Sequence, residues 1–215
     1  DGDLDLLVTS LGRGVRLLRR AGLRVTVGPG RERAESQNAY FRKWILHKVP
    51  WVTLKMAQSL DGKIATAAGE SKWITSPASR EAVQRLRAES DAVLVGRNTV
   101  ICDDPRLSVR KKGAGLPGKP WRVVLDPGLK IPSRARVFTG DAVTVRAVAE
   151  ADLKSAKRAS SRGVILPCIV RRGRIEVQDL LRRLGAMGIA KLLVEGGGET
   201  AWSFLESGCV DRICC

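Results

Sequence analysis

Apolar positions along much of the chain fall into short runs with the period of a strand, separated by stretches with the period of a helix. Val52, Leu54 and Met56 alternate with other residues and so share one face, as they would in a half-buried strand. The run 92–95 is apolar throughout, which is typical of a strand buried on both faces. Both runs therefore predict strands of one sheet.

Helices are predicted between these runs. Ser76 and Pro77 supply an N-cap and a first-turn proline, so a helix is expected from there to about Ser90. Its inward face is predicted to carry four apolar residues, Ala78, Ala82, Val83 and Leu86. Gly22 occupies the position where a helix over 14–22 would end with a positive φ.

The remaining elements follow the same two periods. Further strands are expected at 23–27, 63–67, 122–125, 142–145, 163–167 and 191–194, with another starting at 210, and further helices at 31–44, 98–103, 150–160, 177–187 and 200–206. Strands and helices alternate in the second half of the chain. This alternation predicts an α/β fold whose sheet contains parallel pairs.

The charge of the chain indicates an anionic ligand. Its 215 residues carry a formal net charge of +16. From Lys111 to Ile175 there are fifteen Lys and Arg against four Asp and Glu. Such a field attracts phosphorylated metabolites, dinucleotides or nucleic acid. A solvated basic face is an equally good interpretation. Nucleic-acid binding is disfavoured by the single Tyr and three Phe, because stacking platforms are then scarce.

The cysteines, the single histidine and the chain ends limit the kinds of protein that this sequence can encode. The five cysteines form no Cys-x-x-Cys motif and predict a reduced, cytoplasmic protein without a metal site. A zinc deaminase would need His-x-Glu and Pro-Cys-x-x-Cys, but His47 is the only histidine and Ile-Val follows Pro167-Cys168. No signal peptide or run of ~20 apolar residues occurs. The first residue is Asp, so a fragment or processed product is expected.

Two junctions between a strand and a helix are candidate ligand sites. The run 192–200, Leu-Leu-Val-Glu-Gly-Gly-Gly-Glu-Thr, directs backbone N–H groups and a helix N-terminus toward a ligand. The run 95–99, Val-Gly-Arg-Asn-Thr, is a second junction of this kind. Ligands of open α/β sheets gather at the carboxyl ends of strands. A plain connection between elements remains the alternative for each junction.

Several charged and hydroxyl residues are candidates for binding or catalysis. Lys55 lies in a predicted strand next to a Ser, Asp and Gly-rich loop, although an exposed strand lysine is the simpler interpretation. Ser71, Arg87 and Arg110 would together suit a phosphate, since guanidinium groups bind it bidentately and a hydroxyl adds a donor. Taken singly, each of the three is better explained as a surface polar residue.

The motifs in this order resemble one family. Residues 51–110 and 192–211 resemble the reductase domain of the bacterial bifunctional riboflavin-biosynthesis deaminase/reductase. The matching runs are Val-Thr-Leu-Lys-Met-Ala-Gln-Ser-Leu-Asp-Gly-Lys-Ile-Ala, Gly-Glu-Ser-Lys-Trp-Ile-Thr, Ala-Val-Leu-Val-Gly-Arg-Asn-Thr-Val, Asp-Asp-Pro-Arg-Leu and Leu-Leu-Val-Glu-Gly-Gly. Residues 1–45 look like the tail of the preceding, cytidine-deaminase-like domain. The predicted division is therefore 1–48 and 49–215.

The resemblance implies a fold, a reaction and a set of site residues. The fold is dihydrofolate-reductase-like, with a mixed, mainly parallel sheet flanked by helices. The reaction is NADPH-dependent reduction of 5-amino-6-(5-phosphoribosylamino)uracil to the ribitylamino compound, with hydride delivered to ribose C1′. Lys55 and Glu195 would serve catalysis. Substrate would contact Ser71, Arg87, Arg110 and Glu195, and NADPH would contact Ala57, Trp73, Thr99, Asp103, Leu107, Gly197, Gly198, Glu199 and Thr200.

The resemblance also has departures. The zinc-binding part of the deaminase domain is missing, so deaminase activity is not expected. The family continues for several strands beyond Asp211, and their loss would open a sheet edge. Asp126-Pro127 stands where the family usually has Asp-Ser, which removes one cofactor hydrogen bond. A homo-oligomer is expected, with no nucleic acid or membrane partner. A basic nucleic-acid-binding fragment and an inactive remnant remain the alternatives.

Overall fold

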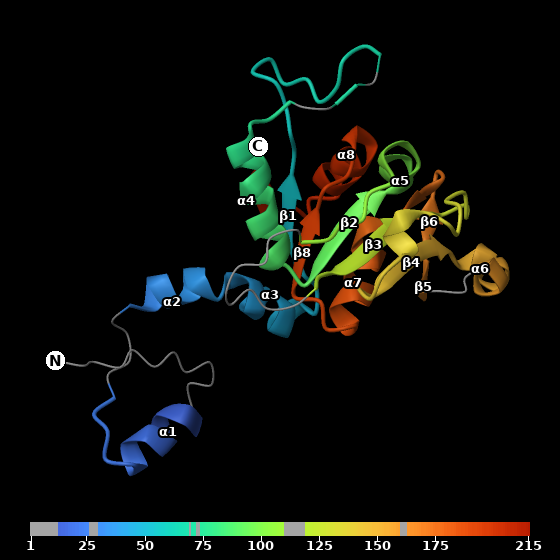
Figure 1. Cartoon of the computed structure of the whole chain (residues 1–215). Helices are drawn as coiled ribbons and strands as arrows, with labels where there is room; N and C mark the ends of the chain where they lie inside the picture. Colours follow the sequence, from blue (N-terminus) through green and yellow to red (C-terminus); the bar gives the residue numbers. More distant parts are fainter. Residues whose placement is uncertain (1–12, 26–29, 69, 72–73, 110–118, 160–162) are drawn as a thin grey trace.

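A single parallel sheet organises the chain in the computed structural model, which describes residues 13–25, 30–68, 70–71, 74–109, 119–159 and 163–215. The sheet has seven strands in the order β5-β4-β3-β2-β8-β1-β9, and every pairing within it is parallel (Figure 1). The strands are β1 Trp51–Lys55, β2 Ala92–Gly96, β3 Trp121–Leu125, β4 Thr144–Ala149, β5 Val164–Cys168, β8 Lys191–Val194 and β9 Arg212–Cys214. The predicted α/β sheet is confirmed.

Helices cover both faces of this sheet. The helices of the described residues are α1 Arg13–Arg20, α2 Arg31–Gln37, α3 Ala39–His47, α4 Pro77–Ala88, α5 Arg97–Asp103, α6 Leu153–Ala159, α7 Val177–Ala186 and α8 Gly198–Glu206, with 3₁₀ turns at Arg136–Phe138 and Glu150–Asp152. In β2, Ala92 and Leu94 pack with α7 and α8, whereas Val93 and Val95 face Val100 of α5. This alternation explains why β2 is buried on both faces, as predicted.

The last of the three central strands comes from far along the chain. β8 lies between β1 and β2, with Leu192 paired to Val52 on one side and to Ala92 on the other. Strand order reverses direction at this point, because β2 to β5 extend one way and β1 and β9 the other. Such a switch point leaves a crevice at the carboxyl ends of the strands.

A buried ion pair fixes the loop that follows β3. Asp126 is fully buried and accepts hydrogen bonds from the backbone N–H groups of Lys130 and Ile131 at 2.9 and 3.1 Å. Its carboxylate also pairs with the guanidinium of Arg146 in β4, whose Nε donates at 2.9 Å. Arg146 lies over the ring of Phe138 at 5.4 Å. These contacts hold residues 127–131 against the sheet.

The join between β5 and α7 contains a second carboxylate with fixed partners. Asp179 accepts hydrogen bonds from the backbone N–H of Ile169 at 3.0 Å and from Nε of Arg183 at 2.8 Å. Burial disfavours its charged form, but these bonds and the nearby guanidinium charges outweigh burial and lower the pKa of Asp179. Burial and the Asp179 charge raise the pKa of Cys168 to about 12, so that thiol stays protonated and unreactive.

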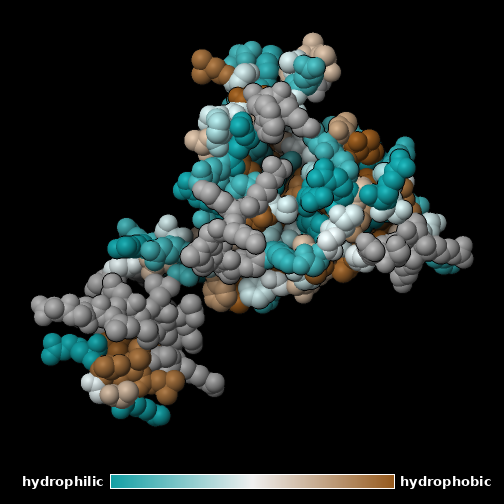
Figure 2. Space-filling model, viewed as in Figure 1, coloured by the Kyte–Doolittle hydropathy of each residue, from teal (hydrophilic) through white to brown (hydrophobic). Residues whose placement is uncertain are grey.

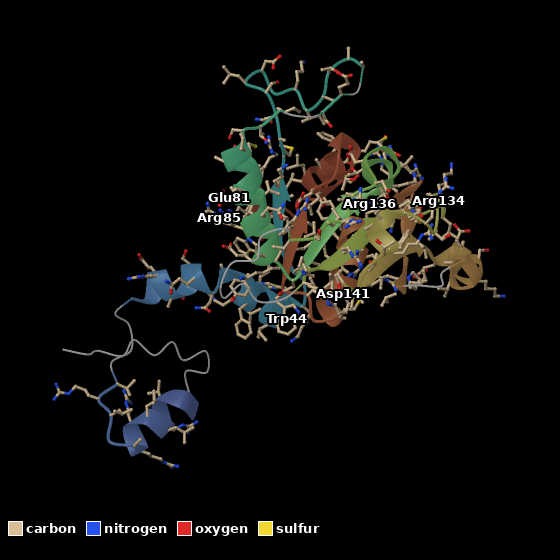
Figure 3. All side chains as sticks on the ribbon, viewed as in Figure 1. Trp44, Glu81, Arg85, Arg134, Arg136 and Asp141 are labelled. Carbon is tan, nitrogen blue, oxygen red and sulfur yellow. The ribbon has the colours of Figure 1, made fainter. Side chains whose placement is uncertain are left out.

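The residues before β1 differ in how they meet the sheet. Helix α3 packs beside β1 and is tied to its surroundings by two contacts. The indole of Trp44, labelled in Figure 3, donates to the carbonyl of Gly185 in α7 at 2.9 Å. Lys43 pairs with Asp211, just before β9, at 2.6 Å. Helix α1 lies away from the sheet and exposes apolar residues, including Leu17 (Figure 2). The division at residue 48 stays a prediction.

Some predicted elements are wrong. Residues 23–25 form no strand, and 26–27 lie outside the described residues; residues 63–67 form turns, with Thr66 accepting from the N–H of Glu70. The helix over 77–88 begins where Ser76 caps it, as predicted, but Ala78 and Ala82 are exposed. The strands β6 Val170–Arg171 and β7 Arg174–Ile175 form an antiparallel hairpin that was not predicted. None of the described helices is long and apolar enough to cross a membrane.

Candidate functional site

A cavity of about 600 Å³ opens at the carboxyl ends of β1 and β8, where the loop after β1, helix α4 and the start of α8 meet. It gathers nine of the predicted site residues. They are Lys55, Ala57, Ser71, Arg87, Thr99, Asp103, Glu195, Gly197 and Gly198. Five separate segments of the chain contribute them, so only the fold brings them together.

Lys55 and Glu195 stand at adjacent strand ends because β1 and β8 are neighbours in register. Leu54 of β1 pairs with Val194 of β8, and the two charged residues follow directly on each strand. The backbone N–H of Glu195 donates to the carbonyl of Leu94 in β2 at 2.8 Å, which fixes the chain as it leaves the sheet. A lysine and a carboxylate therefore line the same cavity from adjacent strand ends.

Arg87 holds the Glu195 carboxylate from α4. Its Nε donates to Oε1 at 2.6 Å and its Nη2 to Oε2 at 2.7 Å, and the two side chains are only 13% and 9% exposed. Burial disfavours the charge on Arg87, but the hydrogen bond to Glu195 and its negative charge outweigh burial and raise the pKa of Arg87. Nη1 reaches the carbonyl of Ser108 at 3.3 Å. This bidentate pair orients Glu195 toward the cavity.

The face that α4 turns to the cavity is polar. Arg80, Gln84 and Arg87 lie four and three residues apart, so they form one stripe on the helix, and all three line the cavity. Nη1 of Arg80 donates to the carbonyl of Thr75 at 2.7 Å. Glu81 also lines the cavity and pairs with Arg85 one turn along (Figure 3). The helical period would have identified Arg80 and Gln84 had α4 been treated as a wall of the site.

A second cavity, of about 200 Å³, lies on the other side of the glycine turn. It is lined by the start of α5, the start of α8, Pro127 and the hairpin β6–β7, and it includes the predicted residues Glu199 and Thr200. Thr99, Gly197 and Gly198 line both cavities. The two hollows therefore lie on either side of this turn, and an elongated molecule that crosses the turn would reach both.

The turn presents donors to such a molecule. Gly197 is the N-cap of α8 and has no side chain to accept from the first N–H groups of the helix. Those N–H groups and the positive end of the helix lie at the junction of the cavities, where they would suit the oxygens of a pyrophosphate. Pro127, which stands where the family usually has Ser, lines the second cavity. Because proline has no side-chain donor, the hydrogen bond expected to be lost lies beside the predicted cofactor site.

Two glycines are required by packing around Thr200. A Cβ at Gly96 would overlap the Thr200 hydroxyl, and a Cβ at Gly196 would overlap its Cβ and methyl. Both glycines have negative or extended φ, so close approach and not backbone strain excludes larger residues. Thr200 is only 9% exposed and holds α8 against the ends of β2 and β8.

We expect Gly196→Ala to destabilise the fold. Thr200 is held within the first turn of α8, so the added methyl forces the turn and helix apart, at a cost of roughly 1–3 kcal/mol. Urea unfolding measures this loss. Gly128→Ala is the control, because its added Cβ would meet nothing nearer than 3.9 Å. Equal unfolding midpoints for the two variants would show that the turn tolerates a side chain.

The remaining predicted residues have separate outcomes. Leu107 is 4% exposed and packs in the core beside Val93 and Val95, so its side chain is not in the described lining of either cavity. Trp73 and Arg110 lie outside the described residues. No group of three His, Cys, Asp or Glu side chains gathers to hold a metal within the described ranges.

Fold and site together define an α/β protein whose cavities, at the carboxyl edge of a parallel sheet, suit an extended, anionic small molecule. The family described as RibD C-terminal domain matches residues 50–215, and the chain belongs to that family. The resemblance drawn from the motifs is thereby confirmed.

Individual relatives agree with this assignment. The riboflavin biosynthesis protein RibD of Aquifex aeolicus is 41% identical over 202 residues, which is 94% of this chain and 55% of the relative. The 2,5-diamino-6-ribosylamino-4(3H)-pyrimidinone 5′-phosphate reductase of Methanothermobacter thermautotrophicus is 40% identical over 165 residues, covering 76% of this chain and 75% of that protein. The chain spans about half the length of the RibD relatives.

Solved structures share the fold. Acinetobacter baumannii RibD superposes with a TM-score of 0.78 at 33% identity, over 94% of this chain and 55% of that one. The riboflavin biosynthesis reductase Rib7 of Saccharomyces cerevisiae gives a TM-score of 0.55 at 20% identity, over 83% and 80% of the two chains, which shows the fold alone. The mainly parallel sheet flanked by helices, expected from the resemblance, is confirmed.

Proposed function

We propose that this chain is a reductase of riboflavin biosynthesis, which reduces 5-amino-6-(5-phosphoribosylamino)uracil to the ribitylamino compound with NADPH. The observation that carries the proposal is the placement of Lys55 and Glu195 at adjacent strand ends, in the lining of a cavity that shares a glycine turn with a second cavity. Family membership and the reductase among the relatives support the same reaction.

The two adjacent cavities suit a dinucleotide that crosses the glycine turn. Its pyrophosphate would lie over Gly197 and Gly198 at the start of α8, since both residues line both cavities. Thr99 would add a hydroxyl donor at the same place. The nicotinamide end would then occupy the larger cavity near Ala57, Asp103 and Lys55. When bound, the cofactor supplies the hydride, and the residues of this chain supply placement and charge.

The reduction adds a hydride at ribose C1′ and a proton at the ring oxygen that is released. Glu195 is held by two charge-assisted hydrogen bonds from Arg87, so its role is to accept hydrogen bonds from the sugar hydroxyls. Lys55 places an ammonium donor at the neighbouring strand end, and we assign the proton to this group. Arg87 then acts on the substrate through Glu195, and a phosphate contact of Arg87 stays a prediction.

Nucleic-acid binding receives less support from the basic run 111–175. Two of its arginines, Arg122 and Arg146, are 4% and 5% exposed and donate to groups inside the fold. They cannot neutralise a backbone phosphate. A cytoplasmic location is part of the proposal, because all five cysteines are free, as in reduced compartments. A homo-oligomer stays a prediction.

The test is a titration of NADPH into the purified chain, followed by energy transfer from its five tryptophans to the reduced nicotinamide. Saturable binding and consumption of NADPH on addition of the phosphoribosylaminouracil are the expected results. A chain that melts cooperatively but binds neither NADPH nor NADH would contradict the proposal. In that case the family relationship would describe ancestry without activity.

A further inference from the structure

The second cavity has two arginines that the proposed chemistry does not use. Arg97 follows β2 at the start of α5, and Arg174 lies in strand β7 of the hairpin, so they reach the cavity from different walls. Arg97 is partly buried and Arg174 is exposed. The cavity lies beyond the glycine turn from Lys55, where the far end of a dinucleotide would extend.

Neither guanidinium has a partner among the residues that the structure describes. Two other arginines of this part of the chain differ in this respect. Arg171, opposite Arg174 in the hairpin, donates from Nε to Glu176 at 3.1 Å, and Arg183 pairs with Asp179 and Glu150. Two unpaired cations beside one small cavity make its electrostatic potential attractive to an anion.

The hairpin holds Arg174 in place. Arg172 and Gly173 both have positive φ, of 50° and 74°, which is the geometry of a tight two-residue hairpin turn. Ile175 next to Arg174 is 6% exposed and anchors the strand in the core. The Arg174 side chain therefore extends from a backbone that is already fixed. Its binding to an anion costs less ordering entropy than binding by an arginine in a loose loop.

We propose that Arg97 and Arg174 clamp the phosphate on the 2′-oxygen of the adenosine ribose, and that this pair determines the preference for NADPH over NADH. The inference rests on the proposed function. A phosphomonoester carries between one and two negative charges and accepts bidentate hydrogen bonds from guanidinium groups. NADH lacks this group and would leave both arginines unpaired.

One acidic residue offers the opposite selectivity. Glu199, in the first turn of α8, is exposed and lines the same cavity. A carboxylate near the ribose favours the free 2′-hydroxyl of NADH. Two cations against one carboxylate leave the cavity net positive, which favours the phosphate.

The experiment compares Arg97→Met, Arg174→Met and the double variant with the unaltered chain. Dissociation constants for NADPH and NADH come from the tryptophan energy transfer. Calorimetry with adenosine 2′,5′-bisphosphate and adenosine 5′-monophosphate gives a readout that needs no nicotinamide. Each single variant is expected to weaken the binding of NADPH and of the bisphosphate by about tenfold to a hundredfold. The dissociation constants of NADH and the monophosphate should stay within about twofold of those of the unaltered chain.

Arg171→Met is the matched control, because it removes a guanidinium from the same hairpin that points to Glu176. It should leave all four ligands unchanged. The inference fails if the unaltered chain binds NADPH and NADH equally, if Arg97→Met and Arg174→Met keep the preference, or if they weaken NADH as much as NADPH. If the unaltered chain binds neither cofactor, the proposed function and the clamp are both wrong.

Discussion

Lys55→Ala is expected to lower kcat of the reductase by about a hundredfold or more, the range for loss of a positioned proton donor. Glu195→Gln is expected to cause a loss of similar size, because glutamine accepts from a sugar hydroxyl more weakly and leaves part of the Arg87 fork unpaired. Steady-state turnover with the phosphoribosylaminouracil measures both. NADPH affinity should change little, since the proposed pyrophosphate contacts lie at the glycine turn.

The control for these two variants is Asp141→Asn, which removes a surface carboxylate that is 76% exposed and pairs with Lys119. It should retain full turnover. Thermal unfolding of Glu195→Gln separates a catalytic loss from a structural one, because Arg87 is buried beside it. Near-normal kcat in both Lys55→Ala and Glu195→Gln would mean that proton transfer and sugar binding are performed by other groups.

Arg146→Met is expected to reduce the free energy of unfolding by roughly 3–5 kcal/mol, the cost of leaving a buried charge unpaired. Asp126 is fully buried, and in this variant it keeps only the backbone N–H groups of Lys130 and Ile131. Methionine replaces the apolar stem of the arginine, so the loss reports the guanidinium, with its ion pair and its contact with the Phe138 ring, and not a cavity.

Adding Asp126→Asn to Arg146→Met should recover part of that loss. Asparagine carries no charge, and its carbonyl oxygen still accepts from a backbone N–H. Urea unfolding of the two single variants and the double variant forms a complete cycle. If the double variant is less stable than Arg146→Met by the full effect of Asp126→Asn alone, the two side chains do not interact and the pair contributes nothing.

Local signals in the sequence identified much of the scaffold. Ser76-Pro77 marked the start of α4, and the apolar run 92–95 marked a strand buried on both faces. Lys55 and Glu195 were assigned through the motifs that surround them. Their closeness, however, depends on the pairing of β1 with β8, which are separated by more than half the chain. Periodicity cannot show which strands become neighbours.

Other features had no local signal. The ion pair between Arg87 and Glu195 joins residues 108 positions apart, so no spacing rule predicts it. Strands β6 and β7 have two residues each, too few to show a period, and Arg174 was therefore overlooked. Ala78 and Ala82 fit the pattern of core residues. In the structure, α4 instead turns its polar stripe toward the cavity, and both alanines are exposed.

The position of β8 has a consequence for synthesis on the ribosome. Strands β1 and β2 emerge early, yet each pairs with β8 and not with the other, so a gap one strand wide, about 10 Å between their axes, separates them until residues 191–194 appear. During that interval both strands expose unpaired edges on which a nascent chain can aggregate. The site is therefore completed late in translation, and chaperones that shield strand edges should affect the yield of this chain more than its final stability.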